Sequence, residues 1–320
     1  MAGPPLGLMT TSPPDRIVHR FAIFTAGCTF LLLIAGALVT SNDAGLAVPD
    51  WPLSYGSLTP PMVGGIFYEH GHRMVATFVG LLSIVLAVWL WRVEPRRWLG
   101  WLGVSALGAV IGQGILGGLT VLFFLPPAIS SAHAALAQLF FCTIVSIAIF
   151  TSSWWDRTRP SATDSSSPSI HSLAAAAGAA TFVQLILGAA FRHKGFGIYP
   201  HLTGAAVVSV LVFALARALR RRFAGVAILR NASRLLYTLV GTQLLLGGAA
   251  WWSRIYGAKF PQPIPIMVNL TVIHTVMGAL VLASLVLLIL VCHRIVLPSD
   301  ARERAIESSS QTSRPRHASL

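Results

Sequence analysis

A chain of 320 residues, of which 55% are hydrophobic and only 10% are charged, is too apolar to fold as a soluble domain. Its mean hydropathy of +0.72 instead predicts an all-α membrane protein with several transmembrane helices. The net charge of +13 would suggest nucleic acid as a partner of a soluble protein, but in a membrane protein the positions of the basic residues matter more. We therefore expect a lipid membrane and no nucleic acid.

The first fifteen residues are rich in Pro, Gly, Ser and Thr. They lack the basic start of a signal peptide and the Arg-rich pattern of a transit peptide, so a bacterial cytoplasmic membrane is the simplest location. The three cysteines lie in or at the end of apolar segments, without the spacing of a zinc site or a disulfide framework. These are Cys28, Cys142 and Cys292.

Eight apolar segments of about 20 residues, the length that crosses a bilayer, follow one another along the chain. Each must be helical, because an isolated span in lipid has no other way to satisfy its backbone. The predicted transmembrane helices are residues 21–40, 73–91, 98–124, 132–149, 173–191, 201–219, 235–252 and 266–292. Eighteen of the 23 Lys and Arg residues fall on one side of this arrangement, so both termini are predicted to be cytoplasmic.

The chain divides into two four-helix halves. Residues 158–172 form a Ser/Pro/Thr-rich segment that reads as a flexible cytoplasmic linker between residues 1–157, with the first outer loop, and residues 173–297. The tail, 298–320, is polar and Arg-rich, and we expect it to be disordered. An internal repeat supports two pseudo-symmetric bundles. Its pattern Gln-x-x-Leu-Gly-small starts at Gln113, Gln184 and Gln243, and a copy without Gln runs from Leu32 to Ala37 and contains Gly36.

After each copy of the repeat, an outer loop leads to a histidine near the start of the next helix. These helices all run inward, so the four imidazoles should lie at a similar depth near the outer face, as the two axial ligands of a haem require. Four residues after each histidine comes a small residue, which would leave room for a flat macrocycle or, alternatively, serve ordinary helix packing. The histidines are His72, His133, His201 and His274, followed by Ala76, Ala137, Ala205 and Gly278.

Glu69 sets the first of these histidines apart. It precedes His72 by three residues, so the two side chains share a face if the helix already includes Glu69. The loop before it, residues 41–68, is the longest of the outer loops, and its Pro, Gly and aromatic residues suggest an ordered lid. Since nothing comparable precedes His201 or His274, we expect a reactive site in the first half and an electron-holding or structural site in the second. The alternative is an interfacial Glu–His pair facing water.

Five basic residues lie on the outer side, against the general charge asymmetry: Arg73, Arg192, Lys194, Arg254 and Lys259. Haem propionates at the outer surface would need such partners, because arginine can hold a carboxylate with two hydrogen bonds. We single out Arg73 and Arg254 as candidates, with exposed loop charges as the alternative. The remaining histidines do not follow the repeat and are not expected to be ligands: His19, His70, His171, His193, His293 and His317.

These motifs resemble the haem A synthase family of the COX15/CtaA type. The resemblance rests on the loop GLAVPDWPL that begins at Gly45, on Glu69-x-x-His72, and on the histidines that open the later helices. It covers nearly all eight predicted helices. Many bacterial members carry a cysteine pair in the first outer loop; this chain has none there and resembles the cysteine-free branch, which puts in doubt any mechanism that uses a loop disulfide.

The resemblance implies an oxidoreductase that converts haem O to haem A by two successive hydroxylations of the C8 methyl group, for cytochrome oxidase assembly. It implies that His72 and His133 ligate the substrate haem, that His201 and His274 ligate a haem b, and that Glu69 assists at the methyl group. Haem O synthase and cytochrome oxidase subunits are the implied protein partners, and a homo-oligomer is left open. The rival prediction is a di-haem b cytochrome that passes electrons between quinone and a partner; a transporter is disfavoured because the helices lack mid-span charges.

Overall fold

The computed structural model describes residues 16–298, which form nine helices and two short strands. Eight helices are long, and α5 is a single short turn. The elements are α1 (Arg16–Ser41), α2 (Gly64–Val93), α3 (Arg97–Leu122), α4 (Pro127–Phe150), α5 (Ser153–Arg157), β1 (Ala162–Asp164), α6 (Ile170–Arg192), α7 (Ile198–Arg222), α8 (Ala227–Gly257), α9 (Pro265–Ile295) and β2 (Val296–Pro298). The all-helical membrane architecture predicted from the sequence is confirmed at this level.

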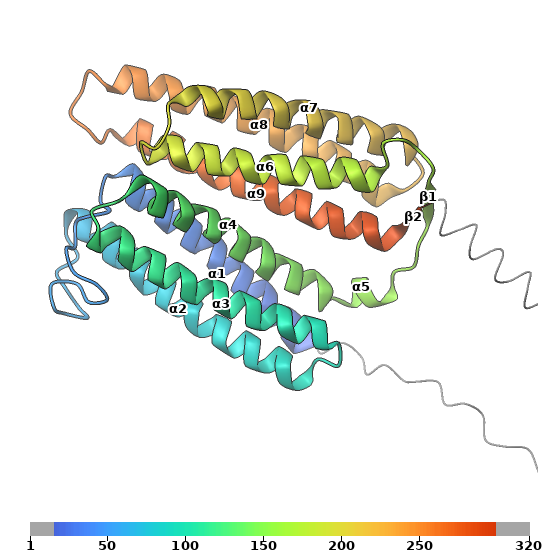
Figure 1. The fold of residues 1–320 in the computed structure, drawn as a ribbon, viewed down its shortest axis with the longest axis horizontal. Coiled ribbons are helices and arrows are strands. Elements are labelled where there is room, and N and C mark those ends of the chain that lie inside the picture. The colour runs from blue at the N-terminus through green and yellow to red at the C-terminus, as the bar shows by residue number, and fades with distance from the viewer. Residues whose placement is uncertain (1–15, 299–320) are drawn as a thin grey trace, which may run out of the picture.

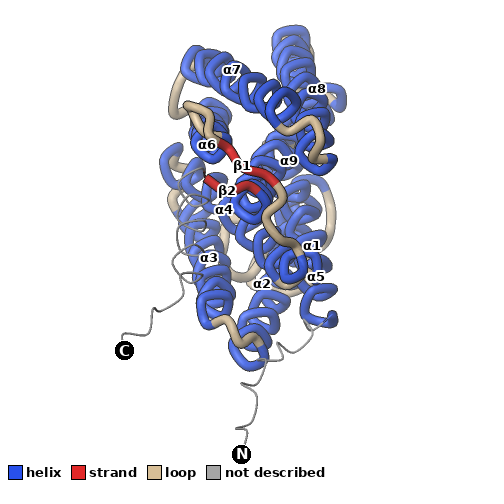
Figure 2. The backbone as a smooth tube through the Cα atoms, turned by 90° about the vertical axis from the view of Figure 1, so that its right-hand side faces the viewer, coloured by secondary structure: helices blue, strands red, loops and turns tan. Residues whose placement is uncertain are grey.

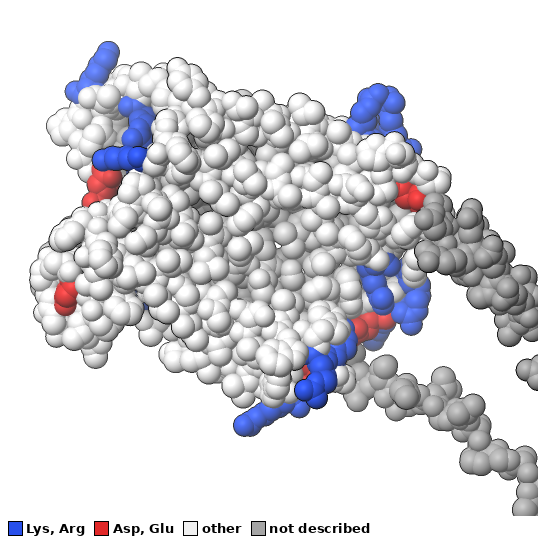
Figure 3. Space-filling model, in the orientation of Figure 1, with Lys and Arg blue, Asp and Glu red and all other residues white. Residues whose placement is uncertain are grey.

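Seven of the helices in the described part of the chain are long and apolar enough to cross a membrane. They are α1 to α4, α6, α7 and α9. Helix α8 has 31 residues, but Thr, Gln and Gly dilute its apolar middle, so composition alone does not identify it as a span. Charged side chains gather toward the two ends of the molecule, and the long middle of the visible face is free of them (Figure 3).

The long helices form two groups that lie one above the other in Figure 1. In the first group α1 contacts α2 and α4, and α3 lies between α2 and α4; in the second, α6 contacts α7 and α9, and α8 lies between α7 and α9. Each group has a buried apolar cluster of its own. The groups meet where α1 and α4 contact α9 and α4 contacts α6, and there Phe141 and Cys142 of α4 pack with Leu282 of α9.

The start of α2 is the most important difference between predicted and observed helix boundaries. The apolar segment begins at residue 73, but the helix begins at Gly64, so Glu69 and His72 lie together on α2. We predicted that their side chains share a face if the helix includes Glu69. Because it does, the three-residue spacing places both side chains on one face of α2. The outer loop is correspondingly shorter than predicted and covers residues 42–63; we call it the lid, and the end of the molecule that carries it the lid end (Figure 1).

The segment predicted as a flexible linker has defined structure. Its β1 pairs in parallel with β2, directly after α9, so that the two segments lie side by side (Figure 2). Asp164 is buried, and its Oδ1 accepts a hydrogen bond of 3.1 Å from the Ser166 N–H. Its Oδ2 accepts another from the N–H of Ile170, the first residue of α6. Composition alone predicted a flexible linker. It does not reveal that a distant strand and the Asp164 carboxylate supply hydrogen-bond partners to the backbone of this segment.

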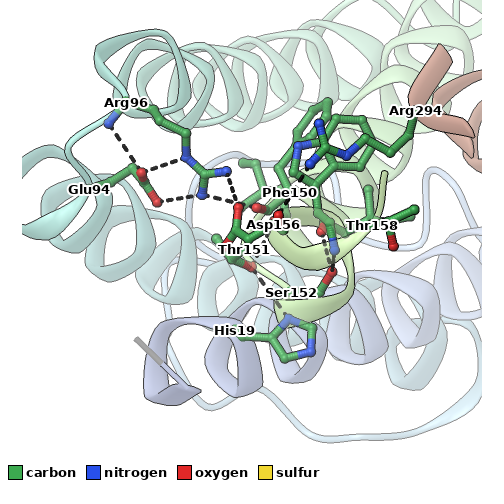
Figure 4. A network of polar contacts seen from close by, with 12 residues as sticks. His19, Glu94, Arg96, Phe150, Thr151, Ser152, Asp156, Thr158 and Arg294 are labelled. Atoms are coloured by element: carbon green, nitrogen blue, oxygen red, sulfur yellow. Dashed lines mark hydrogen bonds and ion pairs between the residues drawn. The ribbon is translucent and has the colours of Figure 1, made fainter. Parts of the chain in front are cut away.

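At the end opposite the lid, which we call the basic end, a polar network joins three loops (Figure 4). Arg96 bonds Glu94 through Nε and Nη2, at 2.7 and 2.9 Å, and Asp156 through Nη1, at 3.1 Å. It also donates to the carbonyl of Phe150 at the end of α4. Arg294 of α9 donates to the carbonyl of Asp156, so the network reaches the second helix group.

The predictions for the chain ends lie largely outside the described residues. Pro298, predicted to start the disordered tail, belongs to β2. Residues 1–15 and 299–320 are not described. Two predictions, the lack of a targeting segment and the disordered tail, concern these residues and lie outside the described part of the chain.

Candidate functional site

The four repeat histidines lie on helices that begin at the lid end, between the fourth and the tenth residue of each helix. Each ring lies against a glycine of the preceding long helix, the glycine of the sequence repeat. A Cβ atom built on that glycine would meet the histidine Cε1 at 3.4 Å or less in all four cases. The distances are 3.2 Å for Gly36 and His72, 3.4 Å for Gly117 and His133, 2.9 Å for Gly188 and His201, and 3.0 Å for Gly247 and His274.

Sequence analysis identified these glycines as a repeat but missed what they do. It assigned the clearance around the ring to the small residues that follow each histidine by four positions. Gly278 instead faces Leu185 and the amide of Gln243, at 3.1 and 3.3 Å from a built Cβ, which is the helix-packing alternative. The signal that could have found the glycines was the fixed order of glycine, outer loop and histidine in every copy.

The repeat glutamine lies beside the histidine of the following helix. Gln113 Nε2 donates to the backbone carbonyl of His133 at 2.8 Å. Gln184 Nε2 donates to the carbonyl of His201 at 2.8 Å and lies 3.0 Å from its Nδ1. These hydrogen bonds hold the turn that carries the imidazole against the neighbouring helix. Because the glutamine amides are partly buried, water does not readily replace the bonds.

His201 and His274 form a facing pair. Their ring centres are 6.3 Å apart and their planes are at 89°. Metal–nitrogen bonds of about 2 Å on each side, with roughly 1.2 Å from each nitrogen to its ring centre, separate two axial imidazoles by about 6.4 Å. This spacing fits the two ligands of one haem iron.

His72 of α2 and His133 of α4 occupy the corresponding positions in the first helix group. The Nδ1 atoms of His72, His133 and His274 are buried without a hydrogen-bond partner. Each of these Nδ1 atoms lies within 4 Å of the Cβ built on the repeat glycine, so the unpaired nitrogen is on the side of the ring toward the neighbouring helix. No cluster of three or more His, Cys, Asp or Glu occurs within residues 16–298.

Glu69 is buried, and both of its carboxylate oxygens hold other groups. Oε2 accepts a hydrogen bond of 2.8 Å from the N–H of Val48 in the lid. Oε1 accepts one of 2.6 Å from Arg73 Nη2. Arg73 Nη1 in turn donates to the lid carbonyls of Asp50 and Leu53, at 2.8 and 2.7 Å. Glu69 and Arg73 together hold the lid over the start of α2, and we call these hydrogen bonds the clamp.

His70, which the sequence did not single out, contributes to the same clamp. It is buried, and its Nδ1 lies 2.8 Å from the hydroxyl of Ser54 in the lid. The lid is also ordered from within, because Asp50 accepts the N–H groups of Gly56 and Tyr55 at 2.8 and 2.7 Å. These bonds hold the pKa of the Asp50 carboxyl below its usual range.

Trp51 carries the lid down onto α3. A Cβ atom built on Gly118 would lie only 2.8 Å from the indole, so the ring rests directly on the bare helix backbone there. The next residue back, Gly117, is the one that faces His133. The tryptophan of the motif GLAVPDWPL thus reaches the level of the first histidine pair.

The outer cations of the second group lie between the two halves. Arg192 donates to the carbonyl of Thr40, at the end of α1. Arg254 lies over the ring of Phe191, 5.6 Å from its centre, and is an electrostatic neighbour of Arg192. Beside them, burial and the charge of Arg192 lower the pKa of His193 to about 4, so this imidazole is neutral at physiological pH. The side chains of Lys194 and Lys259 make no hydrogen bond or ion pair with the residues that the structure describes.

Two surface hollows lie at the basic end, away from the histidines. One is lined by apolar residues of α4 with His19, Trp154 and Leu287, and the other by Arg16, Arg20 and Arg157 with Thr151. They share His19, whose Nδ1 lies 2.9 Å from the carbonyl of Ala148.

Four long apolar helices that each carry a repeat histidine near the lid end define the class: a membrane protein made of many helices. Comparison with known proteins makes the assignment specific. Residues 64–306 match the sequence profile of the COX15-CtaA family, described as cytochrome oxidase assembly protein, and the chain belongs to this family.

Individual relatives agree with the family assignment. The chain is 35% identical over 133 residues to a protein of Shouchella clausii named heme A synthase, covering 40% of this chain and 44% of the relative. A protein of the same name from Maricaulis maris is 36% identical over 151 residues, covering 42% and 44%. One from Symbiobacterium thermophilum is 28% identical over 185 residues, covering 56% and 60%. The matched regions thus span less than two thirds of these relatives.

Proposed function

We propose that this protein is a haem A synthase, an oxidoreductase that converts haem O to haem A for cytochrome oxidase. The observation that carries the proposal is the difference between the two histidine pairs. A buried carboxylate and a closed lid adjoin His72, whereas His201 and His274 face each other without either. Family membership and the printed names of the relatives support the same reaction.

In this proposal His72 and His133 hold the substrate haem, and His201 and His274 hold a haem b. A bound haem supplies the redox chemistry of its iron, and the protein supplies ligands, orientation and exclusion of water. Trp51 and the lid shield the first pair from the outer solvent. Neutral imidazoles in buried surroundings are the form that ligates iron.

Glu69 places a carboxylate on the same face of α2 as His72, where it can stabilise positive charge or take a proton near the haem edge. Its oxygens are occupied by the Val48 N–H and by Arg73. Each oxygen keeps a second lone pair that can take a proton, so these bonds hold the carboxylate in position without blocking it, and the lid helps to set that position. Arg254, whose described contact is the Phe191 ring, is the better candidate for a propionate partner, because Arg73 is committed to Glu69 and the lid.

We further propose that α8 also crosses the membrane, giving eight transmembrane helices in two pseudo-symmetric bundles. The support is packing: α8 lies between α7 and α9, and Pro265 at the start of α9 follows it by a short loop. The basic end would then face the cytoplasm, with both termini, and the histidines would lie near the outer face of a bacterial cytoplasmic membrane. Haem O synthase, cytochrome oxidase subunits and a second copy of the chain are the proposed partners.

Extraction and identification of the haems from purified protein tests the proposal. We expect haem A, with haem O or haem b, from the parent protein, and accumulation of haem O in Glu69→Gln. Ser54→Ala, which loosens the lid at His70 but keeps the carboxylate, is the control and should still contain haem A. Haem b alone in all three proteins would overturn the proposal and favour the di-haem cytochrome.

A further inference from the structure

The two surface hollows at the basic end adjoin each other and differ in chemistry. The apolar hollow has a volume of about 300 Å³ and the polar hollow one of about 240 Å³, and His19 of α1 lines both. We propose that the two hollows together bind one anionic phospholipid, with its phosphate in the polar hollow and an acyl chain in the apolar hollow. The site is independent of the haem chemistry. It requires only that the basic end lies at a membrane surface, which the charge-free middle of the molecule indicates (Figure 3).

Three arginines and no carboxylate line the polar hollow. Arg16 and Arg20 lie one turn apart on α1, and Arg157 ends α5. All three are exposed, and their guanidinium groups make no hydrogen bond or ion pair with any residue in the described part of the chain. Asp156, which precedes Arg157, is engaged by Arg96 at 3.1 Å. Uncompensated guanidinium groups around one hollow favour a phosphate, which an arginine can bind with two hydrogen bonds.

The chain's own ends carry no net negative charge that could occupy this hollow. Residues 1–15 contain one acidic residue, Asp15, and residues 299–320 contain three acidic residues and four arginines. The positive charge of the hollow therefore calls for an outside partner. Anionic lipid headgroups lie at the level of basic residues that flank transmembrane helices, and basic pockets between such helices bind them.

The apolar hollow leads from the polar one toward the middle of the molecule. Its walls come from α4, with Val145, Ala148 and Ile149, and from α9, with Leu287. Val145 lies five residues before the end of α4, so at 1.5 Å per residue the hollow reaches about 7 Å inward from the helix end. Because α4 and α9 belong to different helix groups, an acyl chain bound here would lie in the seam between the groups.

His19 stands at the junction of the two hollows, and its ring is held in place. Its Nδ1 donates a hydrogen bond of 2.9 Å to the carbonyl of Ala148, and the ring lies beside Thr151 in the network of Figure 4. An imidazole has an apolar body and polar nitrogens, which suits the boundary between headgroup and chain. Arginines, imidazole and apolar walls thus follow the same order as phosphate, glycerol ester and acyl chain in a phospholipid.

Native mass spectrometry of the delipidated protein, titrated with phosphatidylglycerol, tests the site. We expect one tightly bound lipid per chain, and weaker binding of phosphatidylcholine, whose headgroup has no net charge. The triple variant Arg16→Gln, Arg20→Gln, Arg157→Gln should weaken the tight binding on the order of a hundredfold, since each basic residue near the surface contributes about fivefold. If this variant does not fold, Arg157→Gln alone should weaken binding about fivefold.

The matched control removes the same charge from the same end of the molecule, outside both hollows. It is the triple variant Arg217→Gln, Arg220→Gln, Arg221→Gln at exposed positions of α7, and it should keep the tight site. Equal phosphatidylglycerol affinities in the two triple variants would refute the site. So would equal affinities of the parent protein for phosphatidylglycerol and phosphatidylcholine.

A second variant tests the acyl chain separately from the charge. Ala148→Leu narrows the apolar hollow and leaves the arginines unchanged, so it should weaken phosphatidylglycerol binding roughly tenfold while the thermal unfolding midpoint stays near that of the parent. Inorganic phosphate in excess should displace the lipid poorly, because it fills only the polar hollow. Unchanged lipid binding in Ala148→Leu, or full displacement by inorganic phosphate, would contradict a site that includes the acyl chain.

Discussion

At Gly247 the lack of a side chain allows the His274 ring to lie against the backbone of α8. A built Cβ would approach His274 Cε1 to 3.0 Å, closer than ordinary contacts. Gly248, the next residue, has open space around the same built atom. Two adjacent glycines in one helix thus have opposite tolerance for a methyl group, although the sequence does not distinguish them.

We predict that Gly247→Ala displaces the His274 ring and lowers the haem content of the second pair. Overpacking of this kind costs about 1–3 kcal/mol, and the ring is the part free to move. Gly248→Ala should retain full haem content and gain slightly from the better helix propensity of alanine. The haem-to-protein ratio from absorption spectra provides the measurement, and equal ratios in the two variants would contradict the assigned contact.

The lid is the element whose behaviour depends most on one contact. Gly118→Ala would bring a methyl group to 2.8 Å from the Trp51 indole and force the ring off α3. Losing about 1.4 kcal/mol of lid packing would raise the population of the open lid roughly tenfold. Limited proteolysis with chymotrypsin, which can cut after the exposed Tyr55, should accelerate by that factor. Gly114→Ala in the same helix meets nothing and should cleave at the parental rate.

The β1–β2 segment has a pH dependence that follows from Asp164. Burial alone would raise its pKa, but the N–H groups of Ile170 and Ser166 and the nearby Arg222 outweigh this and hold the pKa of Asp164 below its usual range. A carboxyl with a lowered folded pKa stabilises the fold fully above about pH 4, the value of a free aspartate, and loses this contribution as the pH falls through the folded pKa.

Asp164→Asn should therefore remove part of the acid sensitivity of the thermal midpoint as the pH falls below about pH 4. The variant and the parent should differ most above pH 4 and converge at the acid end. Asp43→Asn, at the lid end, provides the control. A constant difference between variant and parent across this range would rule out the assigned role.

At the level of elements, the sequence predicted the apolar helices well because hydropathy reports directly on burial in lipid. It placed the start of α2 too late, since residues 64–72 mix glycines and polar residues with Ile66 and Phe67 and do not continue the apolar segment, yet they are helical and are bonded to the lid. It read residues 158–172 as unstructured for a related reason: the partner of β1 is β2, more than a hundred residues away. Pairings between distant segments leave no local pattern.

At the scale of the whole molecule, Arg96 connects the basic ends of the two helix groups through Asp156 and Arg294 (Figure 4). We predict that Arg96→Gln lowers the free energy of unfolding by about 1–2 kcal/mol, because the largely buried Glu94 carboxylate and the more exposed Asp156 lose their charged donor. Arg97→Gln, at an exposed neighbouring arginine without an ion pair, should have little effect. Thermal unfolding of the detergent-solubilised protein measures both; equal midpoints would contradict the prediction.

The four histidines and their order could be predicted from the repeat, because a duplicated motif places equivalent residues in equivalent positions; the pairing of His72 with His133 stays a prediction. The distances that support haem ligation, the 6.3 Å between His201 and His274 among them, could not. Nor could the roles of His70 and Trp51, since each depends on where the lid folds back, which no residue of the lid encodes by itself. The assignment of His72 and His133 to substrate, and of Glu69 to catalysis, stays a prediction.

The parallel pairing of β1 with β2 has a consequence for how the chain could be divided. One strand precedes α6 and the other follows α9, so the second four-helix unit carries a clasp that fastens its own beginning to its own end. If the gene were divided just before residue 160, the downstream fragment would contain both β1 and β2 and could form their pairing by itself. The upstream fragment would keep the lid and the residues that bind it. Co-expression of two such pieces is a natural route to a working split protein.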